Sequence, residues 1–138
     1  MWKKVSPVVV TRWAVLAATI LAAPVPAGAG ERIEVTDLDS LLRRKPLQPD
    51  ALAEIIAARP AGNGQLQVVV MRRIDLHVHD DADHVLYLAR GSGVANLDGE
   101  RREIRVGDII SVPRGVGHGF EKKPDSEDLV FLVVQTPG

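Results

Sequence analysis

"GDIISVPRGVGH" (Gly107–His118) contains a short β-branched run, a tight turn and a histidine in close succession. The β-branched run favours a strand, and Pro113 together with Gly115 predicts a turn directly before the histidine. Similar short runs, separated by Gly, Pro and Asp, fill the chain from Gln65 onward. Because no helical periodicity lies between them, they predict an antiparallel β-sandwich or barrel.

His118 is one of only 4 histidines in the chain, and the others stand in "HVHDDADHVLYLARG" (His77–Gly91). Side chains alternate between the two faces of a strand, so His77 and His79 are expected to point the same way. His84 opens the next predicted strand, and strand pairing would bring it back across from them. A single histidine is more often a surface or packed residue, but histidines in strand-and-turn contexts that can converge predict a shared site. Imidazole is the commonest neutral metal ligand, so the expected cofactor is one divalent transition metal.

The first thirty residues differ from the rest of the chain. A basic segment, an uncharged apolar run and a segment of small residues follow one another, which is the layout of a secretory signal peptide. We therefore expect residues 1–29 to be removed by cleavage near Ala29, and the mature protein to be periplasmic or secreted from a bacterium. The alternative is an uncleaved anchor, but a spanning helix needs about 20 apolar residues. The membrane is thus an expected partner only during export.

The mature chain would be one small, mildly acidic domain. Removing the three basic residues of the signal peptide from the total of 17 Lys and Arg leaves 14, against 18 Asp and Glu, for a net charge of −4. Such a domain without a basic stripe is a poor nucleic-acid binder, so no nucleic-acid partner is expected. The remaining aromatic residues, Tyr87, Phe120 and Phe131, are too few for a platform that stacks bases or sugars.

Two parts are expected in the mature chain: an N-terminal helical arm over residues 30–62 and a β-domain over residues 63–138. "TDLDSLLRRK" (Thr36–Lys45) and "PDALAEIIAARP" (Pro49–Pro60) each combine a weak capping signal with apolar residues on one helical face. We expect these helices to cover one end of the β-domain. A lid or a dimer arm is the alternative.

Two motifs resemble those of the cupin superfamily, and the resemblance covers about residues 65–135. The second cupin motif is Gly, five residues, Pro, one residue, Gly, two residues, His, and every spacing is kept here. The first motif ends in a His-x-His pair, a Glu and a Gly, and here a histidine stands in the glutamate position. The matching residues are Gly107, Pro113, Gly115 and His118 in the second motif, and His77, His79, His84 and Gly91 in the first.

The resemblance implies an antiparallel jelly-roll β-barrel of six to eight strands with a metal inside, commonly Mn, Fe, Ni, Cu or Zn. A four-histidine version of the site occurs among small single-domain cupins, some of which resemble oxygenases. The sequence departs from the family pattern at Met71, where a glycine is usual, and at Lys122, where an asparagine is common. It also departs at His84, because the glutamate of quercetin-cleaving relatives serves as base as well as ligand.

Four neutral ligands would leave the full charge of the ion available to an anion or a polarised carbonyl oxygen. A six-coordinate ion would keep two open positions. The expected function is a metal-dependent dioxygenase acting on a small oxygenated organic molecule. Two alternatives stay open: a non-catalytic metal-dependent binding or sensing module, and an isomerase of sugars or sugar acids.

Few other side chains are candidates for the site. Asp75 shares the strand parity of His77, so it is expected either to transfer protons or to orient a histidine. Tyr87 has the opposite parity to His84 and is expected to pack elsewhere. The apolar run "DLVFLVVQ" (Asp128–Gln135) could fill the barrel or pair across a homodimer interface.

Overall fold

The computed structural model describes residues 32–138, so the predicted signal peptide lies outside the described residues. The chain divides into two units, Met1–Thr36 and Asp37–Gly138. The described part of the first unit, residues 32–36, has no regular secondary structure. Within residues 32–138, no helix has both the length and the apolar character that a membrane span requires.

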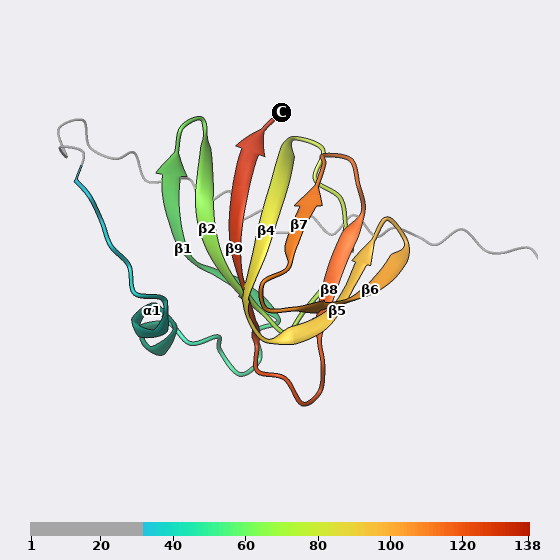
Figure 1. Ribbon diagram of the computed structural model, residues 1–138, viewed down its shortest axis with the longest axis horizontal. Coiled ribbons are helices and arrows are strands. Elements are labelled where there is room, and N and C mark those ends of the chain that lie inside the picture. Colours follow the sequence, from blue (N-terminus) through green and yellow to red (C-terminus); the bar gives the residue numbers. More distant parts are fainter. Residues whose placement is uncertain (1–31) are drawn as a thin grey trace, which may run out of the picture. The chain divides into compact units, whose positions relative to one another are not determined.

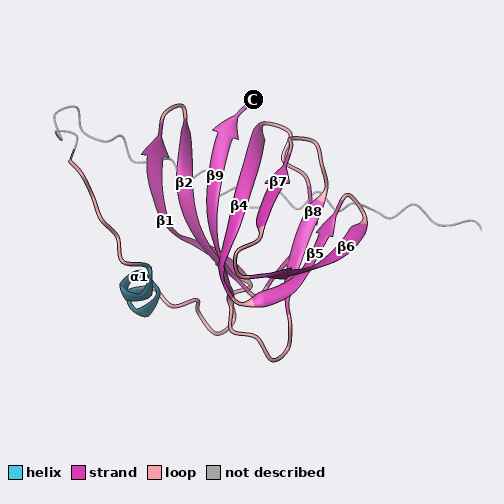
Figure 2. Ribbon diagram, viewed as in Figure 1, coloured by secondary structure: helices cyan, strands magenta, loops and turns pink. Residues whose placement is uncertain are grey.

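The second unit is built almost entirely of antiparallel strands (Figures 1 and 2). A five-stranded sheet has the order β1-β2-β9-β4-β7, and a four-stranded sheet has the order β3-β8-β5-β6. The elements are α1 (Leu38–Arg44), β1 (Ala53–Ala61), β2 (Gly64–Met71), β3 (Arg73–His77), β4 (Ala82–Arg90), β5 (Ser92–Leu97), β6 (Glu100–Arg105), β7 (Ile109–Val112), β8 (His118–Lys122) and β9 (Leu129–Pro137).

The main hydrophobic core draws on both sheets. Leu88, Leu129 and Phe131 are fully buried, and the ring centroids of Phe120 and Phe131 are 5.0 Å apart. Met71, Leu86, Ala95, Ile104, Ile110, Val112 and Val133 complete this core. The inward side chains of each strand alternate with outward ones, as the period of two requires. The fold is therefore a jelly-roll-like sandwich with one shared interior.

The closed barrel expected from the sequence is corrected by the strand pairing. The two sheets remain separate, since no ladder joins an edge strand of one to an edge strand of the other among the described residues. Strand alternation predicts an apolar inner face equally well for a barrel and for two stacked sheets. Only the pairing of the edge strands distinguishes them.

The helical arm contains one helix in the part where two were expected. Asp37 caps α1, because its carboxylate accepts a hydrogen bond of 2.8 Å from the Ser40 N–H. Leu41 and Leu47 then pack on the outer face of the five-stranded sheet against Ile56, Val70 and Val130. This second, smaller core ties the arm to the sheet.

The helix expected over Pro49–Pro60 is wrong, because this segment supplies β1. Strand β1 pairs with β2 in a hairpin that closes at Ala61 and Gly64, with Gly62 at a φ of 60° in the turn. Apolar residues at helical spacing fit β1 as well, because a β-bulge between Ile55 and Ala57 shifts the alternation. The β-sheet therefore begins at Ala53, and the expected boundary at residue 63 falls inside a hairpin.

The apolar run that leads to the histidines is interrupted once. Strand β2 ends at Met71 in one sheet, and β3 begins at Arg73 in the other. Arg72 holds this corner, since its guanidinium donates to the carbonyl oxygens of Gln48, Pro49 and Ala51 and pairs with Asp128. The bend carries the first histidine pair across the core to the four-stranded sheet.

Candidate metal centre

All 4 histidines of the chain converge at one end of the space between the sheets. His77 ends β3, His79 follows it in the loop, His84 lies near the start of β4, and His118 begins β8. The ring centroids of His77 and His118 are 4.3 Å apart, and those of His79 and His84 are 4.4 Å apart. The predicted convergence of the two histidine-bearing motifs is therefore present.

A β-bulge in β3 aims His77 at this cluster. Ile74 pairs with Phe120 and His77 pairs with His118, which leaves one extra residue on β3 between the two pairs. The bulge reverses the alternation, so Ile74 and His77 both face the interior although they are three positions apart, an offset that places residues on opposite faces of a regular strand. Gly119 permits the bulge, because a Cβ atom there would lie 2.9 Å from the Ile74 carbonyl oxygen and from the Leu76 nitrogen.

Backbone carbonyl groups fix the orientation of two of the rings. His77 Nδ1 donates to the Asp75 carbonyl oxygen at 2.8 Å, and His118 Nδ1 donates to the Val116 carbonyl oxygen at 3.0 Å. A carbonyl oxygen can only accept, so Nδ1 carries the proton in each neutral ring and Nε2 keeps its lone pair. Metal-binding histidines in proteins are usually held by such a hydrogen bond on the second nitrogen.

The spacing of the Nε2 atoms suits a metal ion. The Nε2 atoms of His77 and His79 lie 3.0 Å apart. Two ligand nitrogens at about 2.1 Å from one ion, with about 90° between them, are about 3.0 Å apart. The ligand atoms of His77, His79 and His118 all lie within 4.8 Å of one another. These three residues form the tight part of the site.

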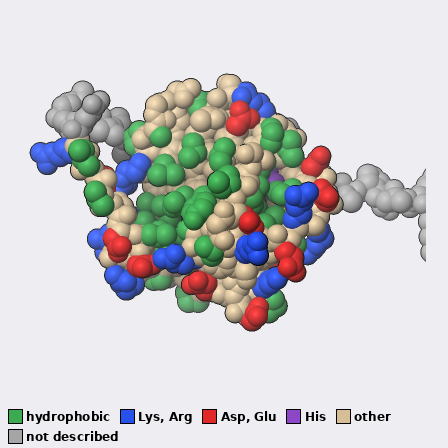
Figure 3. Space-filling view, in the orientation of Figure 1, with side chains coloured by type: hydrophobic (Ala, Val, Ile, Leu, Met, Phe, Trp, Pro, Cys, Tyr) green, Lys and Arg blue, Asp and Glu red, His purple; other side chains and the backbone are tan. Residues whose placement is uncertain are grey.

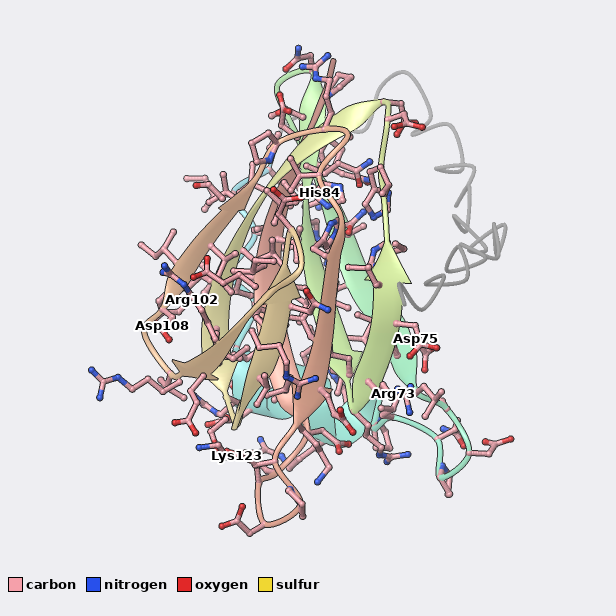
Figure 4. All side chains as sticks on the ribbon, turned by 90° about the vertical axis from the view of Figure 1, so that its right-hand side faces the viewer. Arg73, Asp75, His84, Arg102, Asp108 and Lys123 are labelled. Atoms are coloured by element: carbon pink, nitrogen blue, oxygen red, sulfur yellow. The ribbon has the colours of Figure 1, made fainter. Side chains whose placement is uncertain are left out.

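His84 adjoins this triad and carries an unpaired polar atom. Its side chain is buried, and its Nε2 has no hydrogen-bond partner within the described structure. Leaving such an atom unsatisfied costs on the order of 1–3 kcal/mol. A metal ion beside the triad would satisfy it. Figure 4 shows His84 pointing into the space between the sheets.

Burial keeps three of the histidines, His79, His84 and His118, neutral and ready to donate lone pairs. Desolvation lowers the pKa of His79 to about 4, with a further contribution from His84. Desolvation likewise lowers the pKa of His118 to about 4 and lowers the pKa of His84. Since a metal ligand must be deprotonated, these residues hold the form that binds metal at neutral pH.

The Asp75 carboxylate does not face the histidines. Its side chain is 74% exposed and forms an ion pair of 2.8 Å with Arg73, and both residues lie well away from His84 in Figure 4. The bulge accounts for this placement, because it ends the parity that Asp75 was expected to share with His77. Asp75 contributes its backbone carbonyl oxygen instead. Tyr87 lies on the outer face of its sheet, as its parity predicts.

Two glutamines face the interior near His84, and the sequence patterns did not identify them as site residues. Gln135 is the cross-strand partner of His84, and its Oε1 accepts a hydrogen bond of 3.0 Å from the Nε2 of buried Gln67. Both residues have the inward parity of their apolar neighbours. A polar residue at an inward position of an apolar strand was the signal in the sequence that could have identified them.

The glycines of the two cupin-like motifs stand where the backbone turns. Gly91, Gly107 and Gly115 all have φ between 78° and 98°, a region that side chains with a Cβ disfavour. A Cβ at Gly91 would also lie 3.0 Å from two carbonyl oxygens of the loop before β9. Pro113 begins the turn that Gly115 completes, and the Val116 N–H donates to the Pro113 carbonyl oxygen.

This antiparallel sandwich, with histidines from two motifs at one end of its interior, has the architecture of a cupin domain with a histidine cluster that could hold a metal ion. The family model described as "Cupin domain" matches residues 67–135, and the chain belongs to this family. An uncharacterised protein of Aquifex aeolicus (strain VF5) is 24% identical over 105 residues, which covers 75% of this chain and 84% of the relative.

Solved structures show the same fold. TT1209 from Thermus thermophilus has a TM-score of 0.64 at 23% identity, covering 76% of this chain and 98% of its own. A cupin-2 domain containing protein from Shewanella frigidimarina has a TM-score of 0.59 at 18% identity, covering 75% and 95%. At these identities the likeness establishes the fold and leaves the chemistry to the side chains of this chain.

Proposed function

We propose that this cupin domain binds one divalent transition metal through His77, His79, His84 and His118, and that the metal-bound protein is a dioxygenase of small oxygenated organic molecules. The observation that carries the metal site is the convergence of histidine Nε2 atoms at one point. In His77 and His118 they are oriented by backbone carbonyls, and in His84 the nitrogen is buried without a partner. Manganese, iron, nickel, copper and zinc all accept imidazole ligands.

The bound ion would supply Lewis acidity toward an oxygen atom of the substrate. His79, His84 and His118 would stay neutral while holding it, because burial opposes their protonation. A neutral ligand set leaves the charge of the ion uncancelled in a surround of low polarity. Substrates with adjacent oxygens, such as diketones, hydroxyketones and catechol-like rings, suit such a centre. The amide groups of Gln67 and Gln135 could bind a polar group of the substrate beside His84.

Metal content tests the first half of the proposal. The protein should be purified from the periplasm of its own cells and its bound metals measured. Changing any one of the four histidines to Ala should reduce the stoichiometry or the affinity, whereas Asp75→Ala should leave both unchanged because its carboxylate points away. Full retention of metal binding in a histidine variant would remove that residue from the site.

Oxygen consumption tests the second half. The metal-loaded protein should consume O₂ in the presence of at least one member of a panel of diketones and catechols. Consumption should disappear in the His118→Ala variant, which loses a ligand of the tight triad. Binding of panel members without any O₂ consumption would refute the dioxygenase assignment.

A non-catalytic metal-dependent binding or sensing module is the second candidate. It is favoured by the scarcity of proton-transfer groups at the site: within residues 32–138, Asp75 faces away and Tyr87 lies on the outer face. The same observation disfavours an isomerase of sugars or sugar acids, which must move protons between carbon atoms. Tight binding of a panel member with no turnover would support the binding module.

We also propose that the mature protein is exported and that it self-associates. Apolar side chains cover the middle of the surface in Figure 3, and the outer face of the five-stranded sheet exposes Leu66, Val85, Tyr87, Ile109 and Val134. Contiguous apolar patches of this kind often mark an interface. Sedimentation analysis should detect a homodimer, and Val134→Lys should dissociate it. The Val106→Lys variant in the β6–β7 turn is the control.

A further inference from the structure

Three connections join the loop that carries His79, taken as Val78–Asp83 and so including the first two residues of β4, to its surroundings. The Asp83 carboxylate accepts from the Arg114 backbone N–H at 2.8 Å and from the Arg114 guanidinium at 2.8 and 3.3 Å. The Gly115 N–H donates to the His79 carbonyl oxygen at 2.7 Å. The Gly138 N–H donates to the Asp81 carbonyl oxygen at 2.9 Å. The first two connect this loop to the Pro113–Gly115 turn.

These two loops are the parts of the chain that must meet for the metal site to exist. One loop lies between His77 and His84, and the other ends at His118. Only short segments separate the connected residues from the ligands: Asp83 precedes His84 directly, and Arg114 lies four positions before His118. A change in the distance between the loops would therefore move Nε2 atoms on opposite sides of the site.

The geometry of the Asp83–Arg114 contact is more specific than that of the Arg90–Asp39 ion pair elsewhere on the described surface. Three donors from one residue meet both oxygens of a single carboxylate, and one of those donors is backbone. The Arg90–Asp39 pair, by comparison, rests on one contact of 2.7 Å between half-exposed side chains. Bidentate arginine–carboxylate contacts restrict orientation as well as distance.

We propose that Asp83 and Arg114 are positioning residues that lock the two histidine-bearing loops together and so set the geometry of the metal site. This inference rests on the proposed function. Their role is to hold the ligands at the right separation, and neither side chain needs to touch the ion. Contacts that orient metal ligands without binding the metal typically change metal affinity by about 10- to 100-fold when removed.

The test measures Co²⁺ affinity and the Co²⁺ absorption spectrum, which reports coordination geometry, in the full mature chain. Asp83→Ala should weaken binding by about 10- to 100-fold and change the spectrum. Asp83→Asn should lose less, because its carbonyl oxygen can still accept from the Arg114 backbone N–H. Asp39→Ala, which frees Arg90, should match the wild type.

Asp80→Asn separates positioning from simple electrostatics. Asp80 is an exposed acid in the same loop, so its removal takes away the same charge without breaking the contact to Arg114. We expect Co²⁺ affinity within about twofold of the wild type in this variant, because an exposed charge is strongly screened. An equal loss in Asp80→Asn and Asp83→Asn would overturn the positioning role, as would wild-type affinity in Asp83→Ala.

A measurement on the metal-free protein keeps this inference distinct from the metal site itself. The Gly115 amide should exchange its hydrogen faster in Asp83→Ala than in the wild type, because the loop contact that shields it is weakened. Unchanged exchange would refute the locking of the loops. A wild-type protein that binds no transition metal would instead refute the proposed metal site, and the positioning role would fall with it.

Discussion

Acidification from pH 7 to pH 5 should weaken metal binding far less here than at a site of solvent-exposed histidines. A proton competes with the metal for each ligand, and a histidine with the ordinary pKa of about 6.5 loses about 25-fold in metal affinity over this interval. Three such ligands would together lose about ten-thousand-fold. A buried cluster that resists protonation avoids most of this loss.

The pKa values of this site set the expected magnitude. His79 and His118 both have their pKa lowered to about 4 by burial, so each is almost fully deprotonated at pH 5. Each then contributes a loss of only about 1.1-fold. The pKa of His84 is lowered by the same cause. Even one further ligand titrating at the ordinary value would bring the total to only about 30-fold.

The assay is a competition titration of Zn²⁺ against a chromophoric chelator, calibrated for its own protonation at pH 7, 6 and 5. A peptide with three exposed histidines serves as the control and should show the large loss. A decrease above about 100-fold for the protein would refute the reasoning, since that requires at least two ligands with ordinary pKa values. The burial would then not keep the cluster neutral.

Three other predictions follow from the same features. The free energy of unfolding of the metal-free protein should fall as the pH drops from about 6.5 to about 4, because His79 and His118 bind protons in the unfolded state over this range but not in the folded state. Urea denaturation at several pH values measures this free energy, and a value independent of pH would contradict the prediction. His84→Glu should shift selectivity from copper toward manganese or iron, because a carboxylate hardens the ligand set and cancels one positive charge; identical selectivity in a copper–manganese competition would exclude His84 from the site. Sequencing of the mature N-terminus should give a start near Gly30, and retention of Trp13, visible as tryptophan fluorescence, would sink the export prediction.

Local sequence was a good guide wherever the structure depends on a few neighbouring residues. The turn at Asp98 and Gly99, a residue pair typical of hairpins, joins β5 to β6 with both residues at positive φ. The glycines of the cupin-like motifs take the conformations that only glycine adopts easily. The convergence of the histidines also followed from spacing, because the alternation of strands and turns fixes roughly where each one lies.

The errors arose where contacts from distant parts of the chain decide the outcome. The segment Pro49–Pro60 contains residues compatible with a helix, but pairing with β2 makes it a strand, and nothing within the segment reveals that partner. The prediction that the Asp75 side chain lies on the same strand face as His77 was wrong for a similar reason. A bulge that depends on Gly119 of another strand moves its carboxylate to the surface.

The sequence by itself determined the family, the strand-rich character and which histidines are candidate metal ligands, because these depend on residue types and short spacings. Only the tertiary structure decided that the two sheets remain separate, that His84 adjoins a tight triad, and that Arg114 forms an ion pair with Asp83, 31 positions away in the sequence. The physical reason is that hydrogen-bond partners and burial are properties of surfaces brought together by folding. The residue type of a single side chain does not specify which surface it will contact in the folded protein.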